Sequence, residues 1–123
     1  MRKILLIGVL VVLVNLSLRA WSQFAEIDIG NLPDGTYSAE EADYDESVIR
    51  VKVTVTSGRI TDIKIVESRV DPHVELAKAV IDRVIGLQTV NVDAVTGATF
   101  TSAAILKAVE KALLKAMEQE VQL

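Results

Sequence analysis

The sequence predicts an α+β fold in which a small antiparallel sheet is covered by two helices. Residues 48–56 alternate strictly between apolar and polar side chains, as a strand with one buried face does. Two later stretches, 71–86 and 102–117, instead repeat their apolar residues at the spacing of an amphipathic helix. A sheet with one wet face needs helices against its other face, so both patterns belong to one domain.

An apolar segment precedes the predicted domain. The basic pair Arg2–Lys3 is followed by an unbroken apolar run, Ile4–Val14. This run is shorter than the stretch of about 20 apolar residues that a bilayer span normally needs. A basic start followed by a short apolar run is typical of a secretory signal. Ala20 and Ser22 supply the small residues of a cleavage site, and cleavage there leaves Gln23 as the new N-terminus. An uncleaved signal anchor is the alternative.

We therefore assign residues 1–22 to a signal peptide or an N-terminal membrane anchor, and residues 23–123 to a single domain. The predicted location of that domain is extracytoplasmic: secreted, periplasmic, or anchored to the outer face of the cytoplasmic membrane. The chain has 123 residues, of which 50% are hydrophobic, and this length allows one compact core and no second domain.

The composition excludes several kinds of function. The chain has no cysteine, so disulfides, thiol redox chemistry, iron–sulfur clusters and cysteine-anchored haem are impossible. Its single histidine, His73, excludes multi-histidine sites, and we predict no metal site. A net charge of −4 argues against nucleic acid as a partner, because binding to a phosphate backbone needs a basic face.

The N-terminal part of the domain is predicted to hold one short strand. Pro33–Gly35 is expected to form a turn, and Thr36–Ser38 suits a strand. The acidic stretch Glu40–Ser47 is predicted to be a solvated loop or hairpin tip with no chemical role.

A β-hairpin is predicted next. The alternating strand Val48–Thr56 leads into a tight turn at Ser57–Gly58, and a partner strand follows this turn. Because Ile60 and Ile63 differ in parity along the partner strand, we expect a bulge near Thr61.

Two helices complete the predicted fold. Asp71 can cap a helix that has Pro72 at its first position and that ends at Gly86. A short strand is predicted at Leu87–Val92, and the last helix is predicted to begin at Ser102. The solvent-facing side of that last helix is predicted to carry Lys107, Glu110, Lys111 and Lys115.

The stretch Asp93–Ser102 is the most informative part of the sequence for function. It places four hydroxyl side chains around the small pair Gly97–Ala98, directly before the last helix: Thr96, Thr99, Thr101 and Ser102. The start of a helix has unpaired N–H groups and the positive end of the helix dipole, so a loop of small residues there can hold a phosphate. An ordinary turn followed by a capped helix is the alternative.

The run Asp93–Thr99 resembles the flavinylation motif of the FMN-binding domain family, which reads Asp, two variable residues, Ser or Thr, Gly or Ser, Ala, Thr. In that family the last Thr carries FMN through a phosphoester bond, so the resemblance implies that Thr99 is the attachment residue. Leu32–Tyr37 also resembles the family's opening, although Ala39 stands where Gly is frequent. The resemblance covers roughly residues 32–114.

The resemblance implies an exported electron-transfer flavoprotein, more an electron carrier than a stand-alone enzyme, with no catalytic residue of its own. Its FMN is expected to be installed by a separate, magnesium-dependent FAD:protein FMN transferase. Its redox partners are expected in the membrane or outside the cytoplasm, as for the flavin subunits of ion-pumping electron-transport complexes. The alternatives are an extracytoplasmic binding module that binds FMN without a covalent bond or holds no cofactor.

Roles for the other motif residues follow from their chemistry. Gly97 and Ala98 keep the loop free of bulk, so that backbone N–H groups can approach the phosphate. Thr96, Thr101 and Ser102 can each donate a hydrogen bond to the phosphate or stabilise the helix start. Asp93 repels a phosphate, so it is expected to brace the loop or to help the transferase and its metal ion.

Three residues could lie beside the flavin ring by residue type alone. Phe100 either flanks the ring or belongs to the core, where phenylalanine is found more often. His73 and Tyr37 are further candidates, although an exposed loop histidine and a strand tyrosine are the commoner outcomes.

Overall fold

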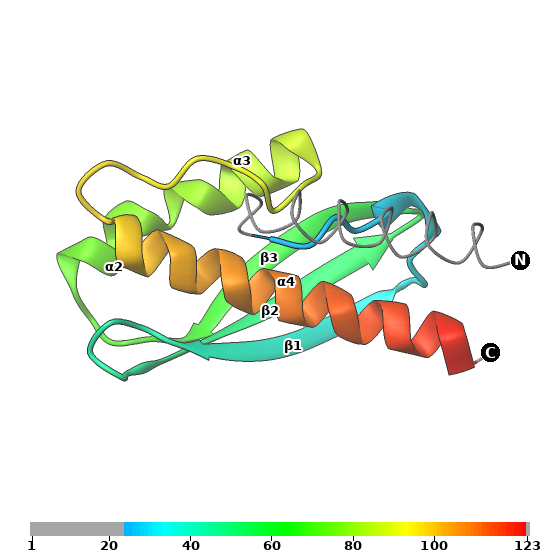
Figure 1. Ribbon diagram of the computed structural model, residues 1–123, viewed down its shortest axis with the longest axis horizontal. Coiled ribbons are helices and arrows are strands. Elements are labelled where there is room, and N and C mark those ends of the chain that lie inside the picture. The colour runs from blue at the N-terminus through cyan, green and yellow to red at the C-terminus, as the bar shows by residue number, and fades with distance from the viewer. Residues whose placement is uncertain (1–23, 123) are drawn as a thin grey trace, which may run out of the picture.

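The computed structural model describes residues 24–122, so the predicted export segment lies outside the described residues. Three strands form one antiparallel sheet in the order β1-β2-β3 (Figure 1). The elements follow one another as η1 (Ile29–Asn31), β1 (Gly35–Ala42), β2 (Val48–Thr56), β3 (Arg59–Glu67), α2 (Pro72–Ala77), α3 (Ala79–Leu87) and α4 (Thr99–Gln122).

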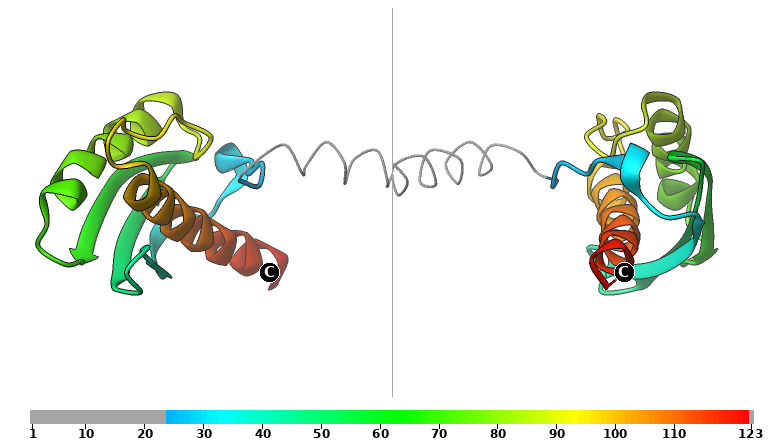
Figure 2. Two further views of the ribbon diagram at one scale, coloured as in Figure 1. Left: turned by 60° about the vertical axis from the view of Figure 1, so that its left-hand side comes forward. Right: turned by 90° about the vertical axis from the view of Figure 1, so that its right-hand side faces the viewer.

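Among the described residues, α3 and α4 lie against one face of the sheet, α2 packs against both of these helices, and the other face is open to solvent (Figure 2). The long helix α4 packs across β1 and β2, while α3 packs against β3. Side chains from β2 and α4 form the centre of the core and are fully buried; they include Ile49, Val51, Val53, Ile105, Val109 and Leu113. The structure therefore confirms the predicted α+β fold with its helix-covered antiparallel sheet.

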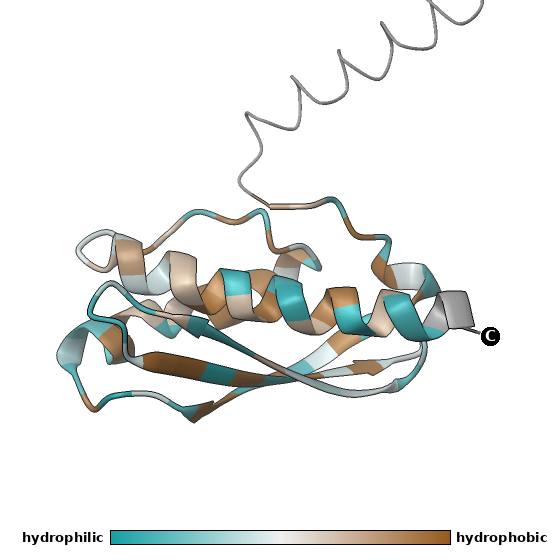
Figure 3. Ribbon diagram, turned by 60° about the horizontal axis from the view of Figure 1, so that its bottom comes forward, coloured by the Kyte–Doolittle hydropathy of each residue, from teal (hydrophilic) through white to brown (hydrophobic). Residues whose placement is uncertain are grey.

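Hydrophobic and hydrophilic residues alternate along the strands, and both kinds are also found at intervals along α4 (Figure 3). In β2, for example, Ile49 is buried whereas Arg50 is exposed, as expected for a strand with one face on the core. Within residues 24–122, no helix has the length and apolar character that crossing a membrane requires.

The predicted bulge in the β2–β3 hairpin is confirmed. Val55 pairs with Ile60 and Thr54 pairs with Asp62, so Thr61 is the extra residue. The turn before it is also as predicted, since Ser57 and Gly58 both have positive φ angles, of 52° and 72°.

The prediction of a short first strand was wrong. β1 continues to Ala42, so residues Glu40–Ala42 form part of the sheet and only the following residues make the connection to β2. Cations on neighbouring elements stabilise these acidic strand residues. Glu40 pairs with Arg50 at 2.7 Å, and Glu41 pairs with Lys111 of α4 at 2.6 Å.

The helix predicted to begin at Pro72, with Asp71 as its cap, and to end at Gly86 is interrupted. The first part, α2, ends at Ala77, and α3 begins at Ala79 and continues through Gly86 to Leu87. At its end Gln88 takes a left-handed conformation with φ of 56°, and its side-chain amide hydrogen-bonds both backbone groups of Ile60. These bonds stabilise the left-handed conformation of Gln88, at a position where helices usually have glycine.

The strand predicted at Leu87–Val92 was also wrong, because the residues after Gln88 form a loop that runs back to the start of α4 (Figure 1). Val90 and Val95 are buried, so their apolar character anchors this loop to the core. Helix α4 begins at Thr99, three residues earlier than predicted.

Glu110 was predicted on the solvent-facing side of the last helix, and this was wrong. Only 7% of the residue is exposed, and its carboxylate accepts a hydrogen bond from the Ala25 backbone N–H at 2.6 Å. The segment that leads into η1 therefore covers this position of α4.

Candidate functional site

The start of α4 lies beside a pocket of about 320 Å³. Three separate segments supply its walls: the β1–β2 connection, the first turn of α2 and the motif loop with the first turn of α4. The lining residues are Tyr44, His73, Gly97, Ala98, Thr99, Phe100 and Thr101. The pocket volume lies at the lower end of the range of roughly 300–1,000 Å³ that is typical of small-molecule sites.

The motif forms a tight turn followed directly by the helix. The Ala98 N–H donates to the Val95 carbonyl at 3.0 Å, which makes Thr96 and Gly97 the two central residues of a β-turn. Gly97 has φ of 88°, the positive value that the third position of a type II turn requires. The turn places Thr99 at the first helical position, where it is exposed.

The other two hydroxyl residues of the motif are buried. Ser102 has no exposed surface, and its oxygen accepts a hydrogen bond from the Val95 N–H at 3.1 Å. Thr101 is 2% exposed and donates to a carboxylate oxygen of Asp43 at 3.0 Å. Both side chains thus connect the helix start to its surroundings, whereas Thr96 and Thr99 are exposed.

Arg69 joins Asp43 to the rest of the site. The Asp43 side chain is fully buried and forms an ion pair with the Arg69 guanidinium, which is 16% exposed. Arg69 also contacts Asp71 at 3.1 Å and Asp45 at 3.3 Å. Burial alone would lower the pKa of Arg69, but hydrogen bonds to Asp43 and Asp71 raise it above its usual value, so the residue stays charged.

Asp71 forms the predicted cap of α2. Its carboxylate accepts the His73 backbone N–H at 2.7 Å, with Pro72 at the first helical position. This hydrogen bond and the contact with Arg69 lower the pKa of Asp71. The second carboxylate contact, with the His73 ring nitrogen Nδ1 at 3.0 Å, fixes the imidazole beside the pocket.

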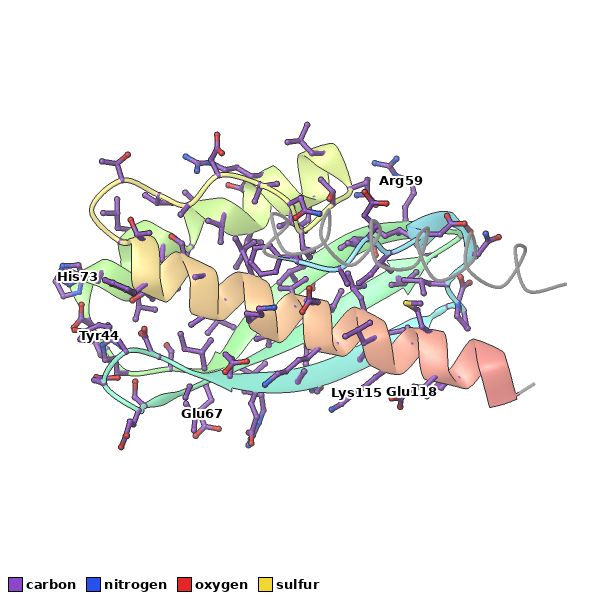
Figure 4. The ribbon with its side chains drawn as sticks, viewed as in Figure 1. Tyr44, Arg59, Glu67, His73, Lys115 and Glu118 are labelled. Carbon is purple, nitrogen blue, oxygen red and sulfur yellow. The ribbon has the colours of Figure 1, made fainter. Side chains whose placement is uncertain are left out.

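Two aromatic side chains at the pocket are exposed. Phe100, which was predicted either to flank the ring or to join the core, is 76% exposed, so the core alternative was wrong. Tyr44 is 63% exposed, and Figure 4 shows it near His73 at the end of the molecule where α4 begins. Tyr37 is buried in the sheet and donates to the Pro33 carbonyl at 2.7 Å, so it does not line the pocket.

Asp93 lies before the turn and is exposed. Its backbone carbonyl accepts a hydrogen bond from Arg83 of α3 at 2.6 Å, and Arg83 also contacts the Ala94 carbonyl at 3.2 Å. An arginine of α3 therefore braces this part of the loop.

Sequence reasoning missed Asp43, Tyr44 and Arg69. The acidic connection was predicted to have no chemical role, yet it supplies the buried carboxylate and an aromatic wall of the pocket. Its only sequence signal was an aromatic residue inside an acidic loop, which does not indicate that the loop reaches a helix more than fifty positions away.

Comparison with known proteins identifies the family. The family model for the FMN-binding domain matches residues 46–114, more than half of the chain and including the whole motif. The chain belongs to the FMN-binding domain family. It is also 37% identical over 84 residues to an uncharacterized protein of Treponema pallidum (strain Nichols); the matched region covers 67% of this chain but only 23% of that relative.

Membership of the family makes this chain an FMN-binding flavoprotein, and the residues present at the site fit FMN. The motif turn and the start of a 24-residue helix offer N–H groups and a positive dipole end to a phosphate. Next to them, the pocket has largely apolar and aromatic walls, as a flat heteroaromatic ring requires. A phosphate group and a ring system can thus be held side by side.

Proposed function

We propose that this domain is an exported electron carrier whose FMN is joined to Thr99 through a phosphoester bond. The observation that carries the proposal is the different burial of the motif's hydroxyl groups. Thr99 is exposed at the pocket, whereas Thr101 and Ser102 are buried and hydrogen-bonded to other parts of the protein. A transferase can reach Thr99 without unfolding the start of α4.

The attachment chemistry needs only a free hydroxyl from this chain. The Thr99 Oγ1 atom forms a bond to the phosphorus of the FMN half of FAD, and the pyrophosphate bond breaks. The leaving group is AMP, which takes up the hydroxyl proton. An FAD:protein FMN transferase is the partner that catalyses this step, and the exposed Asp93 carboxylate is available to that enzyme and its metal ion.

The family's cofactor supplies the redox chemistry, since a bound flavin accepts and releases electrons and a chain without cysteine has no thiol to do so. The protein's contribution is to hold the phosphate at the helix start and to shield part of the ring. A covalent bond also prevents loss of the cofactor outside the cytoplasm. Redox partners in the membrane or outside the cytoplasm are part of this proposal.

The attachment is tested by co-expressing the full chain with a flavin transferase. The wild-type protein should give a fluorescent band in a denaturing gel, with its mass raised by one FMN less one water. Thr99→Ala should give a dark band at unchanged yield, because the residue is exposed and little stability is lost. Thr99→Ser keeps a hydroxyl at the same position and should stay fluorescent.

Two controls locate the bond. Thr96→Ala changes the other exposed hydroxyl of the motif and should remain fluorescent, and Thr101→Ala should keep at least part of the signal. Fluorescence in the Thr99→Ala band would move the attachment to another hydroxyl. Flavin that is released from the wild type by acid precipitation would instead show that FMN binds without a covalent bond.

Export is tested separately. N-terminal sequencing of native material should begin near Gln23, or the intact chain should be found in the membrane fraction. A full-length chain found free in the cytoplasm would contradict this part of the proposal.

A further inference from the structure

We propose that Tyr44, His73 and Phe100 form the seat of the flavin ring. This inference rests on the proposed attachment at Thr99. It assigns to the ring Tyr44 and His73, which lie outside the stretch Asp93–Ser102, together with Phe100, which lies within it. The three side chains line one pocket with Thr99, although they come from the β1–β2 connection, from α2 and from α4.

The distribution of aromatic residues supports this seat. Residues 24–122 contain four Phe and Tyr residues and no Trp. Phe24 and Tyr37 are each 5% exposed and belong to the core, whereas Tyr44 and Phe100 are 63% and 76% exposed and both line the pocket. Large aromatic side chains gain free energy by leaving water, so two of them beside one pocket indicate a surface that a ligand covers.

Tyr44 is held in place although it is exposed. Its backbone N–H donates to the Asp43 carboxylate at 2.7 Å, and the Arg69 guanidinium lies over its ring at 4.8 Å from the centroid. Asp43 is in turn fixed by Thr101 of α4. This network connects the tyrosine to the helix that carries Thr99, so its position does not depend on a flexible loop tip.

His73 is held in a similar way. Asp71 accepts hydrogen bonds from its backbone N–H and contacts its ring nitrogen Nδ1, and Asp71 is itself paired with Arg69. Arg69 thus connects the supports of both Tyr44 and His73. A rigid, preformed pair of rings reduces the entropy lost when a flat cofactor binds between side chains.

Phe100 follows the attachment residue directly in α4. The phosphoester at Thr99 tethers the cofactor at the edge of the pocket, and the ribityl chain gives the ring enough reach to enter it. A largely exposed phenylalanine at the second position of a helix contributes nothing to the core, but it provides a face on which the flavin ring can stack.

The test uses the flavinylated full chain and compares native with unfolded protein. A tyrosine in contact with a flavin quenches its fluorescence by electron transfer, and phenylalanine does not. Tyr44→Phe should therefore raise the native fluorescence several-fold while the fluorescence of the unfolded chain stays the same. Tyr37→Phe makes the identical change in the core, at a residue that does not line the pocket, and should leave the native fluorescence unchanged.

Phe100→Ala tests the stacking contribution. We expect a loss of the visible circular dichroism that an asymmetric protein contact induces in the flavin, and a shifted reduction potential. Leu87→Ala removes another exposed apolar side chain, 69% exposed on α3, and should change neither signal.

The outcomes separate this inference from the proposed attachment. A fluorescent denatured band combined with unchanged native fluorescence in Tyr44→Phe and unchanged circular dichroism in Phe100→Ala would overturn the ring seat and leave the Thr99 bond intact. A wild-type chain that takes up no flavin would overturn both.

Discussion

Gly97 is the residue of the motif with the strictest backbone requirement. At φ of 88° a residue with a side chain is strained by roughly 1–2 kcal/mol. A β-branched residue is the least suited to this region. We expect Gly97→Val to lower the melting temperature and to reduce flavin loading, because a distorted turn displaces Thr99. Thermal unfolding and in-gel fluorescence measure the two effects.

Gly86 provides the matched control for this prediction. It lies inside α3, and a Cβ atom added there has no neighbour within 4 Å. Gly86→Ala should therefore stabilise the protein by about 0.5–1 kcal/mol, because alanine loses less backbone entropy in a helix than glycine. Equal destabilisation by the two glycine variants would contradict the argument from the turn.

Asp43 is the most deeply buried charge at the site. We expect Asp43→Asn to lower the free energy of unfolding by about 1.5–3 kcal/mol, since hydrogen bonds to a charged partner are lost and Arg69 keeps its own charge. Urea unfolding measures this change. Asp45→Asn is the same substitution at a more exposed carboxylate that contacts the same guanidinium, and it should have a much smaller effect.

The contrast between Gly97 and Asp43 shows which residue roles could be predicted from the sequence. Gly97 and Thr99 belong to a continuous motif, so their surroundings are set by neighbours in the chain. Asp43 acquires its role through Thr101 and Arg69, which lie 58 and 26 positions away. Such a contact is a product of the fold, and the local composition of an acidic loop does not reveal it.

At the scale of single elements, the cap of α2 connects stability to pH. The pKa of Asp71 is lowered in the folded protein by the His73 N–H and by Arg69. A carboxyl whose folded pKa is lowered contributes stability above its unfolded pKa of about 3.9, and this contribution is lost as the pH falls further. We therefore expect α2 and the attached His73 to loosen below about pH 4.

The variant Asp71→Asn separates charge from capping, because asparagine caps helices about as well as aspartate. It should be less stable than the wild type at pH 7, and it should lose less of its stability between pH 7 and pH 3. Urea midpoints at both pH values measure the difference. An identical loss in the two proteins would show that Asp71 does not control the acid sensitivity.

Element prediction succeeded where periodicity and turn chemistry agreed. The strand Val48–Thr56 and the bulge at Thr61 were both correct, because alternation fixes which side chains face the core. The strand at Leu87–Val92 failed because apolar β-branched residues can also anchor a loop, as Val90 does. In addition, the backbone N–H and carbonyl of Ile60 in β3 are hydrogen-bonded to the Gln88 side chain, so they are not available to pair with another strand.

Helix α4 contacts the N-terminal segment and borders the pocket at different positions along its length. Phe24 and Ala25, at the point where the described chain begins, contact Lys107 and Glu110 in the middle of the helix. Thr99 and the pocket lie at its start, about 12 Å from Lys107 and about 17 Å from Glu110 at the helical rise of ~1.5 Å per residue. The segment that follows the predicted leader is thus attached to the core at a distance from the proposed flavin site.

Because Glu110 holds the N-terminal segment, a substitution there tests whether this segment and the pocket are independent of each other. Glu110→Leu makes this buried position apolar and removes both the acceptor of the Ala25 N–H and the ion pair with Lys107, so the stability should fall by about 1–3 kcal/mol. Hydrogen exchange of the Ala25 amide should become faster, while the native flavin fluorescence of the loaded chain stays at the wild-type value. Glu110→Gln retains a carbonyl acceptor and should preserve most of the protection. A changed flavin signal in Glu110→Leu would instead show that the N-terminal segment and the pocket are coupled through α4, so that processing of the leader would affect the cofactor.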